Sequence, residues 1–101
     1  MSTISVTKRK YVVASEQTLS QELKKQGFNI VSWEDPPGAT YSPHSHAHDE
    51  IIVVASGAIV FTIDGVEHSL EAGDELVLPA NTVHSAKNHE EKAVRFYICS
   101  N

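Results

Sequence analysis

The stretch "GATYSPHSHAHDEIIVVASG", residues 38–57, holds the features that decide the fold and the chemistry of this chain. His44, His46 and His48 recur at every second residue, and Glu50 keeps the same spacing. Alternate residues of a strand point to one face, so His44 and His46 can reach a single ion together. Imidazole suits first-row transition metals, and a carboxylate adds charge neutralisation. This spacing alone leaves three readings open: a metal site, a pH-sensitive surface and a group of solvated histidines.

The length of a strand limits how many of these side chains can share one ion. An unbroken strand from residue 44 to residue 50 spans about 20 Å. The chain must therefore bend to return Glu50 to the two histidines. We expect His48 to lie to the side of the site, in a role other than metal ligand.

Short strand-like segments surround this stretch, and turn signals separate them every 6 to 12 residues or so. Asp64-Gly65 is a strong two-residue hairpin signal. Residues 51–54 are apolar on both faces, which is typical of a central strand. The pattern predicts an all-β fold, an antiparallel jelly-roll barrel. The expected strands lie within residues 4–14, 28–34, 49–56, 58–63, 66–70, 75–79, 84–88 and 92–100.

One short helix is predicted over residues 16–26. Thr18 and Gln21 have the spacing of a capping box, and Gly27 is a plausible C-cap. The segment looks too narrow and too polar to be a core helix. We therefore expect a single domain over residues 1–101, with an N-terminal strand or arm (1–14), this helix and a β-barrel (28–100).

Composition excludes several classes of function. The 101 residues carry a net charge of −5, which argues against binding nucleic acid or an anionic membrane. The basic run Lys8-Arg9-Lys10 is short and reads as a solvated strand edge. No apolar run approaches the roughly 20 residues of a membrane span, and we see no secretory leader. Cys99 is the single cysteine and is expected to be a small buried hydrophobe. These features predict a cytoplasmic protein.

Two spaced motifs resemble the signatures of the cupin superfamily. In the first, five residues separate Gly38 from His44, one separates His44 from His46, three lie before Glu50 and six before Gly57. The second runs over Gly73, Pro79, His84 and Asn88, and the short gap between the motifs resembles compact microbial single-domain cupins. The chain departs from the family at Asn81, where glycine is common. Asparagine tolerates a left-handed backbone, so the turn can survive.

The resemblance implies a double-stranded β-helix and a metal site. Its ligands would be His44, His46, Glu50 and His84. This set accepts a divalent transition metal such as Fe, Zn, Ni, Mn, Co or Cu. Four protein ligands leave one or two coordination positions for water, substrate or dioxygen.

Function is less determined than fold, because one fold hosts many chemistries. The first hypothesis is a small metal-dependent enzyme acting on a small molecule, dioxygenase-like or related, since cupins include oxygenases, isomerases, decarboxylases and lyases. The alternative is a non-catalytic binding or sensing module with a structural or anchoring metal. A pH switch without metal ranks last, because it leaves Glu50 and the spaced glycines unexplained.

Further expectations concern the walls, the surface and the assembly. In the last strand Val94, Phe96 and Ile98 should line the barrel, and Arg95 should lie on the surface. His68 and His89 are expected to be exposed. Residues 51–54 need cover on two faces, which a second copy could supply if the N-terminal strand crosses over, so we expect a homodimer. Most of the large aromatic residues of the strands should be buried in the core, and some should line the pocket around the metal. These residues are Trp33, Tyr41, Phe61, Phe96 and Tyr97.

Overall fold

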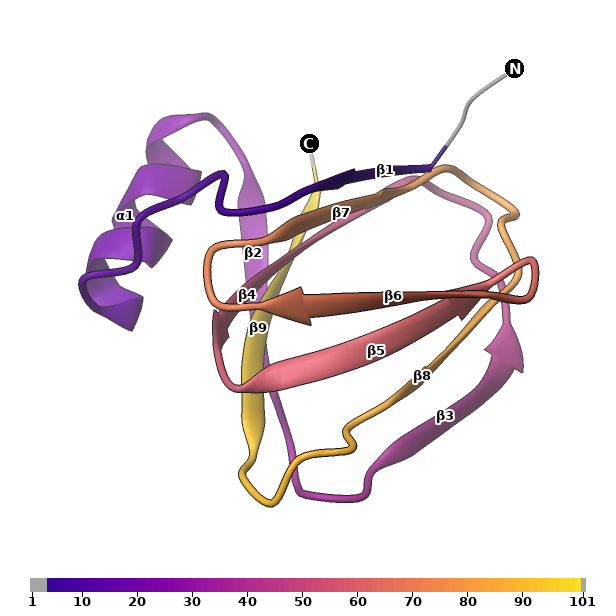
Figure 1. Cartoon of the computed structure of the whole chain (residues 1–101). Helices are drawn as coiled ribbons and strands as arrows, with labels where there is room; N and C mark the ends of the chain where they lie inside the picture. Colours follow the sequence, from indigo (N-terminus) through magenta and orange to yellow (C-terminus); the bar gives the residue numbers. More distant parts are fainter. Residues whose placement is uncertain (1–3, 101) are drawn as a thin grey trace.

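The computed structural model describes residues 4–100, which form nine strands and one helix arranged as two facing antiparallel sheets (Figure 1). One sheet has the strand order β1-β7-β4-β9-β2, and the other has the order β3-β8-β5-β6. The predicted all-β jelly roll with one short helix is confirmed. In chain order the elements are β1 (Ser5–Thr7), α1 (Glu16–Lys25), β2 (Asn29–Asp35), β3 (Thr40–His44), β4 (Glu50–Ser56), β5 (Ala58–Ile63), β6 (Val66–Glu71), β7 (Glu75–Leu78), β8 (His84–Lys87) and β9 (Val94–Ser100).

The main core lies between the two sheets. It is built from the alternate, inward-facing side chains of the paired strands, such as Ile59, Phe61 and Ile63 of β5. Val94 and Phe96 of β9 face them from the other sheet, as predicted for the last strand. Burial of this apolar surface is the main stabilising contribution to the fold.

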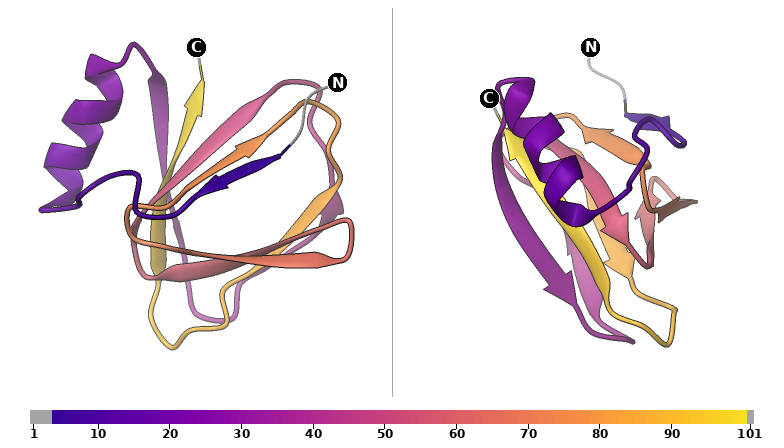
Figure 2. Two further views of the ribbon diagram at one scale, coloured as in Figure 1. Left: turned by 45° about the horizontal axis from the view of Figure 1, so that its top comes forward. Right: turned by 90° about the vertical axis from the view of Figure 1, so that its left-hand side faces the viewer.

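A second core lies on the outer face of the five-stranded sheet, under the helix (Figure 2). Leu19 and Leu23 of α1 are fully buried there against Val53, Ala55 and Cys99. The prediction that α1 is too polar to be a core helix is therefore wrong, because β4 and β9 supply an apolar surface that buries its two leucines. The helix also covers the second apolar face of β4 within one chain, so this face does not by itself require a second copy.

The ends of α1 follow ordinary capping rules, although the N-terminal residues differ from those predicted. Ser15 is the N-cap, and its hydroxyl oxygen accepts a hydrogen bond from the Thr18 amide at 3.1 Å. The Thr18 hydroxyl oxygen in turn accepts from the Ser15 amide. Thr18 is thus the N3 partner of the capping box and not its first residue. At the other end the C-cap is Gln26 and not the predicted Gly27, which follows it with the left-handed φ of 93° that is common just after a helix.

The N-terminal segment is held against its own sheet. In the predicted arm, β1 pairs with β7 of the same chain; residues 1–3 lie outside the described range. Lys8 and Lys10 are exposed, as expected of a strand edge, but both form ion pairs with buried carboxylates, Asp74 and Glu75. The basic run is therefore a clamp between the segment and the β6–β7 turn.

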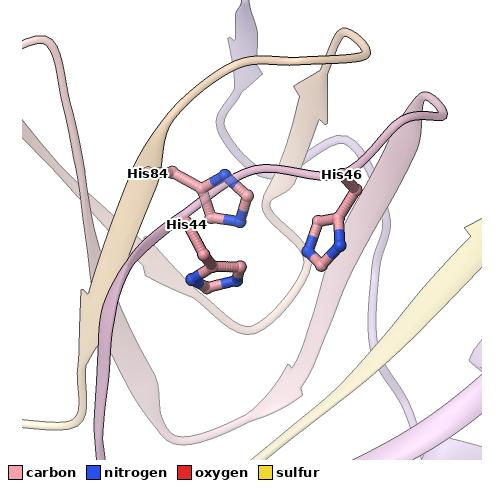
Figure 3. A group of neighbouring side chains, drawn as sticks. All are labelled: His44, His46 and His84. Atoms are coloured by element: carbon pink, nitrogen blue, oxygen red, sulfur yellow. The ribbon is translucent and has the colours of Figure 1, made fainter.

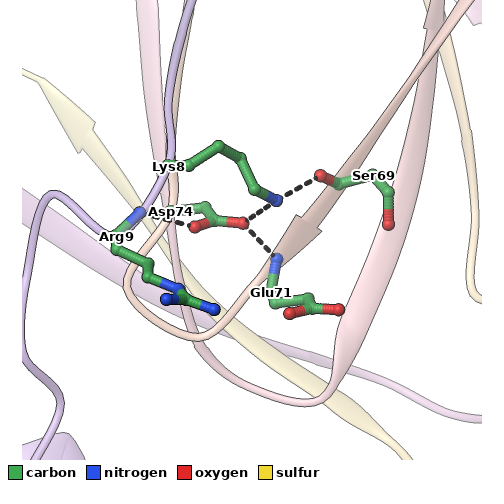
Figure 4. Close-up of polar contacts among 5 residues, drawn as sticks. All are labelled: Lys8, Arg9, Ser69, Glu71 and Asp74. Atoms are coloured by element: carbon green, nitrogen blue, oxygen red, sulfur yellow. Dashed lines mark hydrogen bonds and ion pairs between the residues drawn. The ribbon is translucent and has the colours of Figure 1, made fainter.

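Asp74 is the centre of this clamp (Figure 4). One of its oxygens accepts from the Arg9 amide at 2.8 Å, and the other accepts from the Glu71 amide at 2.7 Å and from the Lys8 ammonium. Burial raises the pKa of the Asp74 carboxyl, but the hydrogen bonds from Lys8, Glu71 and Arg9 outweigh it and lower the pKa overall. Gly73 belongs to the same turn. It combines a φ of 91° with close contact to the Tyr11 carbonyl, so a Cβ has no room.

No helix within the described residues is long and apolar enough to cross a membrane.

At the position where the family commonly has glycine, Asn81 has a φ of 66°. The expected left-handed turn is thus formed by asparagine.

We predict that Asp74→Asn lowers the free energy of unfolding by about 1–3 kcal/mol near neutral pH, because an amide cannot accept all three hydrogen bonds. The additional stability of the wild type over Asp74→Asn should disappear as the pH falls below about 4. The reason is that the folded-state pKa of Asp74 is lower than its unfolded value, so the stabilising carboxylate becomes protonated. Urea unfolding at several pH values measures both effects. Asp64→Asn, in the exposed hairpin turn, is the matched control. Equal stability of the two variants at pH 7 would contradict the clamp.

Candidate metal centre

The candidate ligands come from the ends of three strands and one loop. His44 is the last residue of β3, Glu50 the first of β4 and His84 the first of β8. His46 lies in the loop between β3 and β4, so its position does not come from strand alternation, as the spacing had suggested. The chain bends at residues 47 and 48, which confirms the predicted bend before Glu50.

Three histidines converge (Figure 3). The nearest nitrogens of His44, His46 and His84 all lie within 4.8 Å of one another. The His44 and His84 rings are closest, with centroids 4.4 Å apart. Side chains distant in sequence thus surround one point, which is the arrangement that a metal ion requires.

Backbone carbonyls orient two of the rings in the same way. The Nδ1 atom of His44 lies 2.6 Å from the Ser42 carbonyl oxygen, and that of His84 lies 2.8 Å from the Thr82 carbonyl oxygen. Because a carbonyl oxygen only accepts, each Nδ1 must carry the proton. In the neutral ring, Nε2 is then left with its lone pair, which is the form that binds a metal.

The electrostatics of His84 favour the same form. This side chain is only 4% exposed, and burial lowers its pKa. The Thr82 carbonyl raises the pKa, His44 and His46 lower it, and Glu50 raises it, with a net lowering from the usual value of 6.5. His84 is therefore neutral around pH 7 and available as a ligand.

Glu50 adjoins the three histidines without joining their group. Its carboxylate is buried, with Oε1 3.5 Å from Nε2 of His46 and Oε2 3.8 Å from Nε2 of His48. The His48 side chain is 67% exposed, on the solvent side of Glu50. The donor set of three imidazoles beside one carboxylate fits a divalent transition metal, and His44, His46 and His84 could hold such an ion.

A cavity of about 230 Å³ opens beside this group. Its walls are mainly apolar and aromatic, as expected for a small-molecule site. Phe96 and Ile98 line it, as predicted from the last strand, whereas Arg95 points to the surface and pairs with Glu16 and Glu34. The remaining lining residues are Trp33, Tyr41, His44, His46, Glu50, Ile52, Phe61, His84 and Ala86.

An irregularity in β3 brings Tyr41 and His44 to the same cavity. Tyr41 pairs with Ala86 and His44 with His84, so three residues of β3 advance where β8 advances two. Residues three apart on a regular strand point to opposite faces, and the additional residue of a bulge cancels that difference. Pro43 was the available signal for this bulge, since proline within a strand is confined to edges, first positions and bulges.

Sequence reasoning also missed an acidic group behind the cavity wall. Asp35 is buried at the end of β2, and its Oδ1 accepts a hydrogen bond from the Tyr41 hydroxyl at 2.7 Å. The available signal was alternation: Val31, Trp33 and Asp35 share a face of β2, the face that holds the cavity-lining Trp33.

Two other side chains differ in environment from their neighbours in sequence. Asn88, a motif position, is fully buried and anchors the β2–β3 turn by donating to the Pro36 carbonyl at 3.1 Å. His68, predicted to be exposed, is half-buried with an inaccessible Nε2, because its partner Phe61 places it on the inner face of the hairpin. His89 is exposed, as predicted.

Comparison with known proteins agrees with this geometry. Residues 31–100 match the family model of the Cupin domain, which is more than half of the chain. This protein belongs to the cupin family. The helix α1 and the basic run Lys8-Arg9-Lys10 precede the matched residues.

Named relatives of this cupin include enzymes. It is 40% identical over 70 residues to quercetin 2,3-dioxygenase from Bacillus subtilis (strain 168), an alignment that covers 66% of this chain and 21% of the relative. It is 38% identical over 48 residues to dimethylsulfoniopropionate lyase DddW from Ruegeria pomeroyi, which covers 48% of this chain and 32% of the relative. The alignments thus span a fifth to a third of these curated relatives.

A solved structure shares the fold. The structure of KdgF from Halomonas sp. is 31% identical to this cupin, with a TM-score of 0.63. The superposition covers 72% of this chain and 67% of that one.

The link between Asp35 and Tyr41 can be tested by titration. The pKa of the Tyr41 phenol is raised to about 12, first by burial and then by the hydrogen bond and the charge of Asp35. In Asp35→Asn we predict that this pKa falls but stays above 10, because burial of the ring persists. Spectrophotometric titration at alkaline pH measures it, and the difference from Tyr41→Phe identifies the Tyr41 signal. An unchanged titration in Asp35→Asn would refute the hydrogen bond.

Proposed function

We propose that this cupin is a small metal-dependent enzyme, dioxygenase-like or related, that acts on a small organic molecule. His44, His46 and His84 would hold a divalent first-row transition metal, with Glu50 as the fourth ligand. The observation that carries the proposal is the convergence of the three histidines, two of them with Nε2 freed by a carbonyl at Nδ1.

A metal in this set of ligands would supply Lewis acidity and an exchangeable position for water, substrate or dioxygen. The residues of the chain would prepare that position. The carbonyls of Ser42 and Thr82 fix the His44 and His84 rings before any ion binds, so these rings lose little conformational entropy on binding. The buried Glu50 carboxylate offsets part of the charge of a divalent cation.

The cavity indicates the kind of substrate. Phe61, Phe96 and Trp33 provide flat apolar walls, and the histidines provide one polar end. A small, largely apolar or aromatic molecule with one metal-binding group fits this distribution.

The relatives support oxygenase or lyase chemistry, because the chain aligns with part of a dioxygenase and part of a lyase. Within that range, a dioxygenase-like reaction is our first choice, since that relative aligns over more of the chain. The cytoplasmic location and the homodimer remain predictions from the sequence.

We predict that His84→Ala weakens metal binding by more than about 100-fold. This loss is larger than the loss caused by replacing a residue that only supports a metal ligand. Elemental analysis of the untagged protein and competition with a chromophoric chelator measure occupancy and affinity. His89→Ala, which removes an exposed histidine from the β8–β9 loop, should bind metal like the wild type. Full occupancy in His84→Ala would refute the ligand assignment.

Catalysis needs a separate measurement. The protein reconstituted with ferrous iron should consume oxygen with a catechol, thiol or diketone, and His84→Ala should not. An oxygen electrode follows the reaction, and the metal-free wild type is the blank. Full metal occupancy with neither oxygen uptake nor conversion of substrate would favour the alternative, a binding or sensing module in which the metal anchors a ligand.

A further inference from the structure

Tyr41 differs from the other aromatic residues of the cavity because its hydroxyl group is hydrogen-bonded to a buried carboxylate. Its ring lines the cavity, 6.3 Å from the His44 ring between centroids. Its hydroxyl donates to Oδ1 of Asp35 at 2.7 Å, and Asp35 is only 6% exposed. A phenol has one proton, so the bond to Asp35 uses the only donor that Tyr41 has. What the hydroxyl oxygen still offers is an acceptor.

Asp35 adds a second acceptor beside the first. Its Oδ2 is buried and has no hydrogen-bond partner among the described residues. A buried polar atom without a partner is unfavourable, and a donor from a bound molecule or a bridging water relieves it. Asp35 lies behind the cavity wall, so the acceptor that the pair can offer to a molecule in the cavity is the Tyr41 hydroxyl oxygen.

The backbone holds this pair in place. Asp35 and Tyr41 flank the β2–β3 turn, and the fully buried Asn88 side chain donates to the carbonyls of Pro36 and Lys92, at 3.1 and 2.9 Å. The Gly38 amide also donates to the Asn88 carbonyl at 3.0 Å. A fixed acceptor discriminates between ligands better than a mobile one, because it cannot turn to offer its proton.

We propose that Tyr41, fixed by Asp35, is a specificity-determining residue of the cavity that recognises substrates carrying an O–H or N–H donor away from their metal-binding group. The inference rests on the proposed function in that it takes the cavity as the substrate site. It narrows the substrate class to hydroxylated or amino-bearing small molecules, with aromatic ones favoured by the walls.

Three matched probes test the inference: 4-(hydroxymethyl)catechol, 4-ethylcatechol and 4-(methoxymethyl)catechol. The first carries a donor, the second carries no polar group on its arm and the third carries an acceptor only. Isothermal titration of the zinc-loaded protein, in which no redox reaction occurs, measures their affinities. The hydroxymethyl compound should bind about five-fold more tightly than either of the others, the ratio that one hydrogen bond provides.

The preference should disappear in Tyr41→Phe, which keeps the ring and removes the acceptor. Tyr97→Phe is the matched control, since the Tyr97 hydroxyl donates to the Glu16 carbonyl under the helix, away from the cavity. It should retain the preference. Equal affinities of the three probes in the wild type, or a preference that survives in Tyr41→Phe, would overturn the inference.

The same probes separate this inference from the proposed function. NMR titration of the metal-free protein, which reaches millimolar dissociation constants, should show the same ratio at lower affinity. If zinc does not raise the affinity of any probe, the metal assignment fails while the ratio still decides the role of Tyr41. If zinc raises all three affinities equally and no ratio appears, the metal assignment stands and the role of Tyr41 is refuted. Absence of binding in both forms also refutes it.

Discussion

The pairing of β3 with β8 is the contact on which the candidate site depends. It sets His44 directly opposite His84, and the bulge in β3 turns Tyr41 into the same cavity. A regular strand would send one of these two side chains to the outer surface. The loop after β3 then needs only a short bend to bring His46 beside them. One irregular pair of strands thus assembles the polar end and part of the wall of the cavity.

The outer face of the neighbouring sheet is closed by the chain's own N-terminal region. α1 buries Leu19 and Leu23 against β4 and β9, and the clamp at Asp74 holds the preceding segment to the β6–β7 turn. The helix and the basic run precede the residues that match the cupin family, whereas Asp74 and its turn lie within them. The helix and the clamp leave the cavity between the sheets open, so the same chain combines a rigid outer layer with an accessible interior.

Much of the fold could be predicted because it follows from local chemistry. The strands from residue 50 onward lie close to where alternation and turn residues placed them, and Gly27 and Asn81 adopt the backbone conformations expected of them. The role of α1 was misjudged, since two leucines on a polar helix reveal burial only when the partner surface is known. His68 was misjudged for a similar reason, because its environment depends on the strand opposite.

Residue identity and spacing were enough to indicate the jelly roll, the family and the four candidate ligands, because these signals can be read along the sequence without knowing which strands pair. Spatial assembly settled the rest. The bulge that aims His44 and the Asp35–Tyr41 pair both join groups from different strands. Such contacts depend on the register of the paired strands, because a shift of one residue moves every side chain of a strand to the opposite face.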